Sequence, residues 1–205
     1  MIDFHTFATS NGQRVAILLE ECALPYRVHW IDLMKGEQHT PGFLKLNPAG
    51  AIPVIVDPEG PDGKPLTLSQ SGAIVIYLAE KTGRFIPLDP VRRLTALQWL
   101  LQATTDAARA SSAIFLVSTL VPEKFPGNTA FFEQQCLRYL RSADGRLADR
   151  EYLADELSIA DFALYPVYAV RKALIEQAGD LAHLSRWGNT MAARPAVARA
   201  MALAG

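Results

Sequence analysis

Two polar turns that lead into predicted helices are the strongest candidates for binding chemistry in this sequence. The first turn is Thr9-Ser10-Asn11-Gly12-Gln13, and the second is Gln70-Ser71-Gly72-Ala73. The first turn of a helix exposes backbone N–H donors at the positive end of the helix dipole, so an anion is stabilised there. If both helices begin at the same edge of one sheet, the turns can jointly hold one extended anionic molecule. Ser and Asn are also ordinary helix caps, and the spacing alone leaves that alternative open.

Other familiar catalytic patterns are missing from the sequence. It contains neither a G-x-G-x-x-G motif nor a P-loop, so nucleotide binding has no support. Cys22 and Cys136 form no Cys-x-x-Cys motif, and we expect neither a disulfide framework nor a catalytic cysteine. No metal is expected, because metal-ligand spacing is missing among the four histidines, His5, His29, His39 and His183.

Composition narrows the classes of partner. The 205 residues carry 20 Lys+Arg against 21 Asp+Glu, which excludes a polybasic nucleic-acid surface. The most apolar run, residues 15–24, is interrupted by two glutamates and is shorter than the ~18 residues that span a bilayer. The chain begins without a basic segment followed by an apolar one, as a secretory signal would have. We therefore expect a cytoplasmic protein with no nucleic-acid or membrane partner.

The distribution of proline, glycine and alanine changes near residue 88. Eight of 13 prolines and eight of 13 glycines lie in residues 1–88, whereas 23 alanines lie in residues 89–205 and only 7 before them. Because Pro and Gly favour turns and Ala favours helix, the first part is predicted to be mixed α/β and the second helical. The predicted domains are residues 1–86 and 91–205.

Hydrophobic periodicity in the first part predicts the order βαβαββα. The predicted strands cover residues 2–7, 26–30, 52–56 and 66–68. Helices are predicted after the first polar turn up to Leu24, from the Thr40-Pro41 cap to Leu46, and from Ser71 to a C-terminal Gly83. Pro53 removes one ladder hydrogen bond, so the third strand either starts irregularly or carries a cis Ile52-Pro53 bond.

The second part reads as helix almost throughout. Helices are predicted over residues 91–119, 129–148, 158–178, 181–193 and 196–204. Ser158 and Asp161 are spaced as a capping box at the start of the third of these helices.

Three segments together resemble the signature segments of cytosolic glutathione transferases. They are residues 9–15 (TSNGQRV), 47–55 (NPAGAIPVI) and 70–81 (QSGAIVIYLAEK), and residues 158–162 are similar to the capping motif of that family's helical domain. The resemblance implies a thioredoxin-like first domain, an all-α second domain and a homodimer. It also implies glutathione as a cosubstrate, bound mostly to the first domain, with no metal.

The resemblance assigns glutathione contacts residue by residue. Ser71 and the amides beside it would hold the γ-glutamyl carboxylate, with Gln70 adjacent. The Ile52 backbone would pair with the cysteinyl amide, which a cis Pro53 makes accessible, and Gln38 would reach the glycyl end.

The glutathione sulfur would lie against Thr9, Ser10 and Asn11, which are the predicted catalytic residues. A free thiol of pKa ~8.5 is about 3% ionised at pH 7, and a hydroxyl or amide donor at a helix N-terminus stabilises the thiolate. Theta and delta members place a serine four residues before the arginine, as Ser10 precedes Arg14. The bacterial nu kind, the Ure2-like disulfide-bond reductases, instead carries Thr-x-Asn-Gly-x-Lys/Arg, which this chain matches.

The nu resemblance implies glutathione-dependent disulfide reduction, with peroxide reduction an open alternative and modest conjugation to small electrophiles. The alternative function is a non-catalytic glutathione-binding or regulatory protein of the same fold. Two departures predict weaker glutathione binding: the nu kind usually has an acidic residue in place of Gln70, and Gly50 lacks a side chain for the glycyl carboxylate. The second-substrate pocket is expected along the first long helix, at residues that could equally be core: Trp99, Ala107, Ser111 and Phe115.

Overall fold

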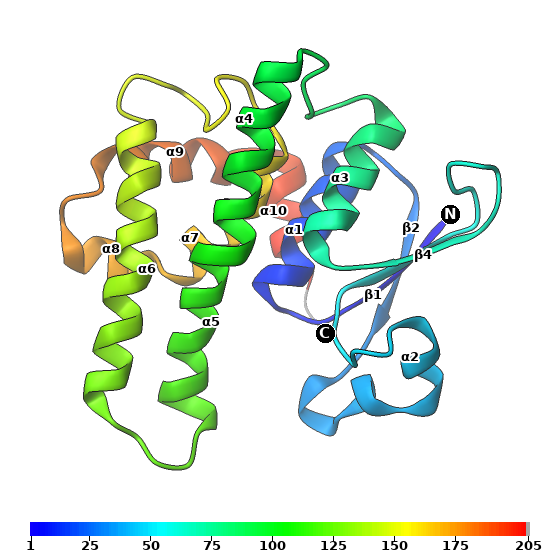
Figure 1. The fold of residues 1–205 in the computed structure, drawn as a ribbon, viewed down its shortest axis with the longest axis horizontal. Helices are drawn as coiled ribbons and strands as arrows, with labels where there is room; N and C mark the ends of the chain where they lie inside the picture. The colour runs from blue at the N-terminus through cyan, green and yellow to red at the C-terminus, as the bar shows by residue number, and fades with distance from the viewer. Residues whose placement is uncertain (204–205) are drawn as a thin grey trace. The chain divides into compact units, whose positions relative to one another are not determined.

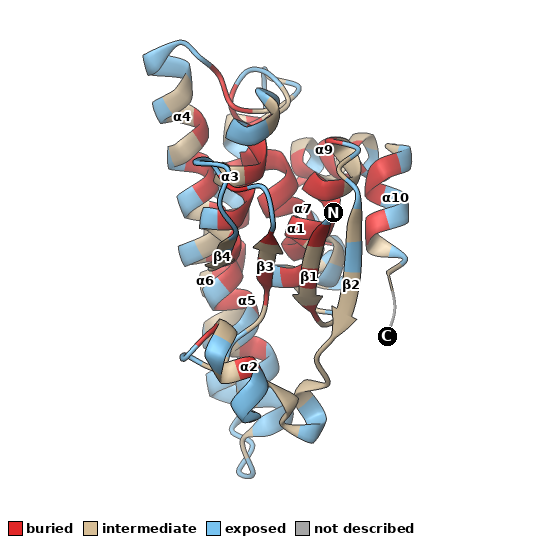
Figure 2. Cartoon of the chain, turned by 90° about the vertical axis from the view of Figure 1, so that its right-hand side faces the viewer, coloured by how far each residue is buried: buried red, intermediate tan, exposed pale blue. Residues whose placement is uncertain are grey.

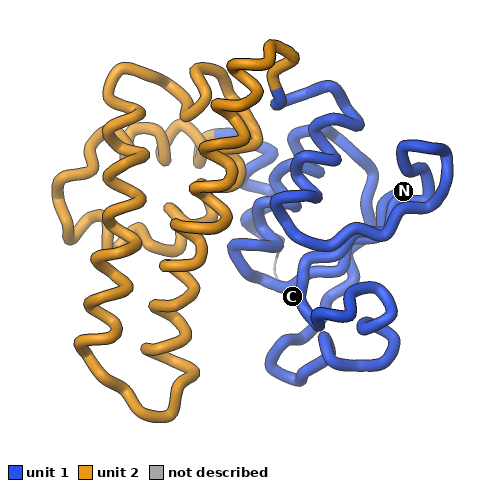
Figure 3. Tube along the Cα trace, viewed as in Figure 1, with its two compact units in different colours: residues 1–86, 194–205 blue, residues 87–193 orange. Residues whose placement is uncertain are grey.

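The computed structural model describes residues 1–203, which divide into two units (Figure 3). Of the described residues, the first unit contains residues 1–86 and 194–203, and the second contains residues 87–193. The predicted second domain, 91–205, therefore differs at its end, because the last helix belongs to the first unit. Residues 204 and 205, the last two of that predicted domain, lie outside the described residues, and residue 204 is also the last of the predicted helix 196–204.

A four-stranded sheet forms the centre of the first unit (Figure 1). Its strands lie side by side in the order β2-β1-β3-β4, as Figure 2 shows. β1 pairs in parallel with β2, and the other two pairings are antiparallel. The strands are β1 Ile2–Thr6, β2 Tyr26–Trp30, β3 Val54–Asp57 and β4 Leu66–Ser69.

The helices of this unit are α1 Ser10–Glu21, α2 Pro41–Leu46, α3 Ser71–Thr82 and α10 Pro195–Met201, with short 3-10 turns η1 Leu33–Lys35 and η2 Glu37–His39. The predicted order βαβαββα and the thioredoxin-like fold are confirmed. α1 and α3 pack on each other, and α3 contacts β3 and β4. Phe4, Ile55 and Leu78 are fully buried in the resulting core.

Local sequence explains where these helices begin and end. Thr9 has an extended backbone, and its hydroxyl accepts a hydrogen bond from the Gly12 amide, so it is the N-cap of α1. Thr40 caps α2 in the same way ahead of Pro41. α3 ends at Gly83, whose left-handed backbone suits a glycine. The Ile52-Pro53 peptide is cis, and β3 begins after it.

The C-terminal helix α10 packs on α1 and is tied to it by ion pairs. Arg194 donates to both carboxylate oxygens of Glu21, at 2.6 and 2.8 Å, and Arg199 pairs with Glu20 at 2.7 Å. Val197 is fully buried. These contacts with α1 explain why α10 belongs to the first unit, although it follows the helices of the second unit in the sequence.

The second unit is helical, as predicted. Its helices are α4 Pro90–Leu101, α5 Ala108–Phe115, α6 Pro126–Arg146, α7 Ile159–Val170, α8 Lys172–Ala178 and α9 Ala182–Ala192. No helix within residues 1–203 is long and apolar enough to cross a membrane.

The predicted helix 91–119 is interrupted by two π-helical stretches, η3 Gln102–Ala107 and η4 Leu116–Leu120. Thr104 and Thr105 donate side-chain hydrogen bonds of 2.8 Å to the carbonyls of Leu100 and Leu101. Such hydroxyls compete with the backbone N–H groups for the same carbonyls, which favours a local change of helical pitch. The predicted helix 158–178 is likewise divided, at Arg171.

The capping box predicted at the start of α7 is present and forms a buried network. Asp161 accepts hydrogen bonds from the backbone N–H of Leu153 and from Nε1 of Trp187 on one oxygen, at 3.1 and 3.0 Å. Its other oxygen accepts from the backbone N–H and hydroxyl of Ser158, at 3.0 and 3.1 Å. Burial raises the pKa of Asp161 to about 6.

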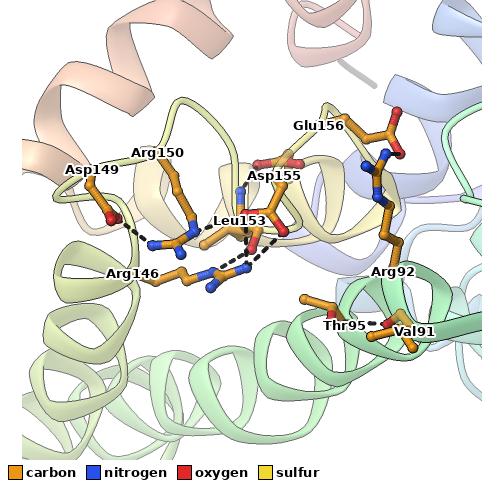
Figure 4. Close-up of polar contacts among 10 residues, drawn as sticks. Val91, Arg92, Thr95, Arg146, Asp149, Arg150, Leu153, Asp155 and Glu156 are labelled. Carbon is orange, nitrogen blue, oxygen red and sulfur yellow. Dashed lines mark hydrogen bonds and ion pairs between the residues drawn. The ribbon is translucent and has the colours of Figure 1, made fainter.

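Arginines fix the loop that precedes α7 (Figure 4). Arg146 donates to the Leu153 carbonyl and to Asp155, and Arg150 donates to Asp155 at 2.8 Å. The loop therefore holds the Leu153 amide where Asp161 can accept from it.

Candidate functional site

The N-terminus of α1 presents the three predicted catalytic side chains. Thr9 is used as the cap, with 3.2 Å between its Oγ1 and the Gly12 nitrogen. Ser10 is half-exposed and Asn11 is exposed. Within residues 1–203 neither the Ser10 hydroxyl nor the Asn11 amide group has a hydrogen-bond partner. Both side chains can therefore donate to a ligand at this helix start.

Gly12 brings this turn close against the end of β1. A Cβ atom at position 12 would overlap the Thr6 hydroxyl and lie 2.6 Å from the Phe7 carbonyl oxygen. A residue without a side chain is therefore needed for the close approach.

The second predicted turn forms the N-terminus of α3. Ser71 is buried and is the first residue of the helix, while Gln70 is exposed and has a left-handed φ of 71°. Ser71 accepts a hydrogen bond of 3.2 Å from Nη1 of Arg14 in α1. One side-chain contact thus joins the two helices whose starts were predicted to share an anionic ligand.

Arg14 is the residue of this site whose role sequence reasoning missed. It is 1% exposed, and burial lowers the pKa of its guanidinium to about 10, so it is still protonated at neutral pH. The available signal was a cation at the start of an otherwise apolar run, residues 14–19, all of which are buried. Apolar helix faces rarely include a charge without a specific partner.

The remaining predicted glutathione contacts lie on the segment between β2 and β3. Ile52 and Pro53 directly precede β3 and lie outside its ladder. Gln38 is in η2, and its Oε1 is buried without a partner in the described part of the chain. Gly50 has a φ of 60°, and a Cβ there would lie 2.9 Å from Nδ1 of His39. His39 therefore fills the space that a side chain at position 50 would enter.

The residues predicted for a second-substrate pocket lie on helices of the second unit. Trp99, Ala107 and Ser111 are buried, whereas Phe115 is exposed. Nε of Arg171 donates to the Ser111 hydroxyl at 2.8 Å, so this serine has a structural partner. The pocket itself remains a prediction.

The two cysteines lie apart from the predicted site residues in the sequence, and neither forms a disulfide. Cys22 and Cys136 are both buried and unpaired. Burial raises the pKa of the Cys136 thiol to about 11 and also raises that of Cys22. Among the described residues, no group of three or more His, Cys, Asp or Glu side chains could hold a metal ion.

Comparison with known proteins identifies matching domains and relatives. Residues 9–81 match the N-terminal domain of glutathione S-transferases, and residues 132–195 match their C-terminal domain. The chain is 34% identical to disulfide-bond oxidoreductase YfcG of Escherichia coli, over 98% of this chain and 94% of that protein. It is 31% identical to disulfide-bond oxidoreductase YghU of the same organism, over 97% and 73%.

Two solved structures of glutathione transferases have a similar fold. A glutathione transferase from Pseudomonas putida, with one glutathione disulfide bound per subunit, has a TM-score of 0.91 at 30% identity and covers 100% of this chain and 92% of its own. A glutathione transferase from Burkholderia graminis, with two glutathione molecules per subunit, also has a TM-score of 0.91, at 34% identity over 98% and 87%. The family predicted from the three segments is confirmed: this chain belongs to the glutathione S-transferases.

Proposed function

We propose that this protein is a glutathione-dependent enzyme that reduces disulfides, with conjugation to small electrophiles as a lesser activity. The observation that carries the proposal is the hydrogen bond from Arg14 to Ser71, which joins the N-terminal parts of two helices. At the start of the same helix as Arg14, the Ser10 and Asn11 side chains have no partner among the described residues. The names of the two Escherichia coli relatives and the glutathione disulfide in the Pseudomonas putida structure support disulfides as the substrate class.

In the proposed complex, glutathione lies along the first unit. Ser71 and the amides of α3 bind the γ-glutamyl carboxylate, with Gln70 beside it. The Ile52 main chain, next to Pro53, pairs with the cysteinyl amide, and Gln38 lies near the glycyl end. Each contact uses a group at the start of an element or outside the sheet ladder.

The reaction proceeds by two thiol–disulfide exchanges. The thiolate of bound glutathione attacks one sulfur of the substrate disulfide, the S–S bond breaks, and one substrate half leaves as a thiolate. A second glutathione thiolate then attacks the glutathione sulfur of the mixed disulfide, which releases the other half as a thiolate and forms glutathione disulfide. Donors from Thr9, Ser10 and Asn11, together with the N-terminus of α1, stabilise the first thiolate.

The proposal is tested by measuring glutathione-dependent reduction of a small mixed disulfide, and conjugation of an aromatic chloride, with the same preparations. Ser10→Ala and Asn11→Ala should lower the rates, each by about tenfold for a lost donor. Asn189→Ala, which removes an exposed amide in the second unit, is the matched control. Wild-type rates in both site variants would refute the site. A wild-type protein that binds glutathione without turnover would establish the non-catalytic alternative.

We also propose a cytoplasmic homodimer. Val91, Leu94 and Leu101 of α4 are 71%, 67% and 55% exposed, and their spacing puts them on one side of the helix. Exposed apolar stripes of this kind are typical of protein contacts. Sedimentation of wild type and Leu94→Glu should give a dimer and a monomer, and a monomeric wild type would refute this proposal.

Second-substrate selection is proposed for the helix segment that contains Trp99, Ala107, Ser111 and Phe115. Phe115 is the most accessible of these residues, so Phe115→Ala should change kcat/KM for bulky disulfides more than for small ones. Equal effects on both would assign this residue to structure alone.

A further inference from the structure

We propose that Arg14 is a positioning residue for the anion site at the start of α3: it fixes the Ser71 hydroxyl as a donor and supplies the buried positive charge that a bound carboxylate neutralises. This inference rests on the proposed glutathione site and extends it to a side chain with no assigned role there.

The hydrogen bond between Arg14 and Ser71 has only one possible direction. A guanidinium has donors and no acceptor, so Nη1 donates and the Ser71 oxygen accepts, over 3.2 Å. The serine proton is then left to point away from the arginine. Because Ser71 is the first residue of α3, its proton and the free amides of the first turn can converge on one anion.

The charge of Arg14 has no counter-charge within residues 1–203. Its side chain forms no ion pair there, and desolvation is the sole cause of its lowered pKa, without any contribution from a nearby carboxylate. Nε and Nη2 are buried and have no hydrogen-bond partner in the same residues. Nη2 shares its carbon atom with Nη1, so it lies in the neighbourhood of Ser71 as well.

Two positive features therefore meet at this point without an acidic side chain between them. One is the buried guanidinium, and the other is the N-terminus of the 12-residue helix α3. A buried charge that is left unpaired destabilises the folded state, and an anion that approaches from the ligand side compensates for it. Gln70, which is neutral, preserves this excess of positive charge beside Ser71.

Substitution of Arg14 has different effects on stability and ligand binding depending on whether the residue serves packing alone or positions the anion site. If Arg14 serves packing alone, Arg14→Met destabilises the protein and leaves ligand preference unchanged. If Arg14 is held for the ligand, Arg14→Met removes an unpaired buried charge while it weakens carboxylate binding. Stability and binding would then change in opposite directions.

The test compares two ligands by calorimetry: glutathione, and glutathione whose γ-glutamyl carboxylate is converted to an amide. Wild type should prefer glutathione strongly. Arg14→Met should lose at least tenfold in affinity for glutathione and little for the amide, should raise KM with kcat nearly unchanged, and should have an equal or higher Tm without ligand. Arg14→Lys should recover part of the preference. Arg141→Met, which breaks an exposed ion pair with Asp180, is the control and should keep wild-type affinities.

An unchanged preference for glutathione over the amide in Arg14→Met would overturn the inference, and so would a lower Tm with unchanged affinity. If Arg14→Met does not fold, Arg14→Lys in wild-type and Ser71→Ala backgrounds decides the question. The lysine change should weaken binding in the first background and have little effect in the second, and equal effects in both would overturn the inference. Wild type that fails to bind glutathione would instead refute the proposed function.

Discussion

Gly12 shows how a single residue sets the geometry of the proposed sulfur site. Its missing side chain allows the turn at Thr9 to Asn11 to lie against Thr6 and Phe7 at the end of β1. A larger residue would have to push the turn and the strand end apart, and the donors at the start of α1 would move with the turn.

We predict that Gly12→Ala lowers stability by about 1–3 kcal/mol, because the new methyl group is overpacked. The rate of disulfide reduction should fall by about 10- to 100-fold, since small displacements of reacting groups have effects of this size. Urea unfolding and the reductase assay measure the two quantities. Gly145→Ala, at a helical position with open space around its Cβ, is the control. Wild-type activity in Gly12→Ala would show that the turn tolerates displacement.

Asp161 in the second unit holds together a network of buried hydrogen-bond donors. Asp161→Ala would leave buried N–H groups of Leu153, Ser158 and Trp187 without their acceptor. We expect a loss of about 3–5 kcal/mol in the free energy of unfolding, because each unsatisfied buried donor is costly. Asp149→Ala, at an exposed carboxylate, should change it by less than about 0.5 kcal/mol. Similar stabilities for the two variants would contradict the network.

At the scale of elements, the attachment of α10 to α1 is a distinct structural device. Its two ion pairs differ in burial: the side chains of Arg194 and Glu21 are 29% and 6% exposed, whereas those of Arg199 and Glu20 are 59% and 20% exposed. We therefore expect the more buried pair, Arg194 with Glu21, to contribute more to the free energy of unfolding than the more exposed pair, Arg199 with Glu20.

We predict that Arg194→Ala destabilises the protein by about 2–3 kcal/mol, since it leaves the Glu21 carboxylate buried without a cation. Arg199→Ala should lose less than about 1 kcal/mol, as exposed pairs do. Chemical denaturation followed by far-UV circular dichroism compares the variants. If Arg199→Ala were the more damaging change, burial would not be the deciding factor.

The elements that sequence predicted well are those specified by local signals. The cap at Thr40, the stop at Gly83 and the Ser158 capping box all depend on neighbouring residues, and all three are confirmed. Periodicity likewise gave the strand and helix order.

The features that sequence reasoning missed depend on contacts between distant residues. Arg14 and Ser71 are 57 positions apart, and Glu21 and Arg194 are 173 apart. No local pattern reports such pairs, so the role of Arg14 and the place of α10 required the structure. The π-helical stretch η3 has a local cause in Thr104 and Thr105, but apolar periodicity does not distinguish π from α turns over a few residues.

At the scale of the whole molecule, the burial of both cysteines indicates that the reactive thiol belongs to glutathione and not to the protein. Cys22 and Cys136 are both buried, and Cys22 contacts the hydroxyl of Thr82 at 3.3 Å. With a pKa near 11, the Cys136 thiol is about 0.1% ionised at pH 8, and burial raises the pKa of Cys22 as well. Neither protein thiol is suited to attack a disulfide.

We therefore predict that the double variant Cys22→Ala, Cys136→Ala keeps glutathione-dependent disulfide reduction within about twofold of wild type, at a temperature where it remains folded. The chemistry would then come entirely from glutathione held at the start of α1. In parallel, iodoacetamide should label the native wild-type protein far more slowly than the urea-unfolded protein, because the thiolate is the reactive form and it is suppressed by burial. If Cys22→Ala alone abolished reduction while Asn11→Ala did not, a protein thiolate would be the nucleophile. The start of α1 would then only bind glutathione, and the protein, not glutathione, would supply the attacking thiolate, contrary to what the burial of both cysteines indicates.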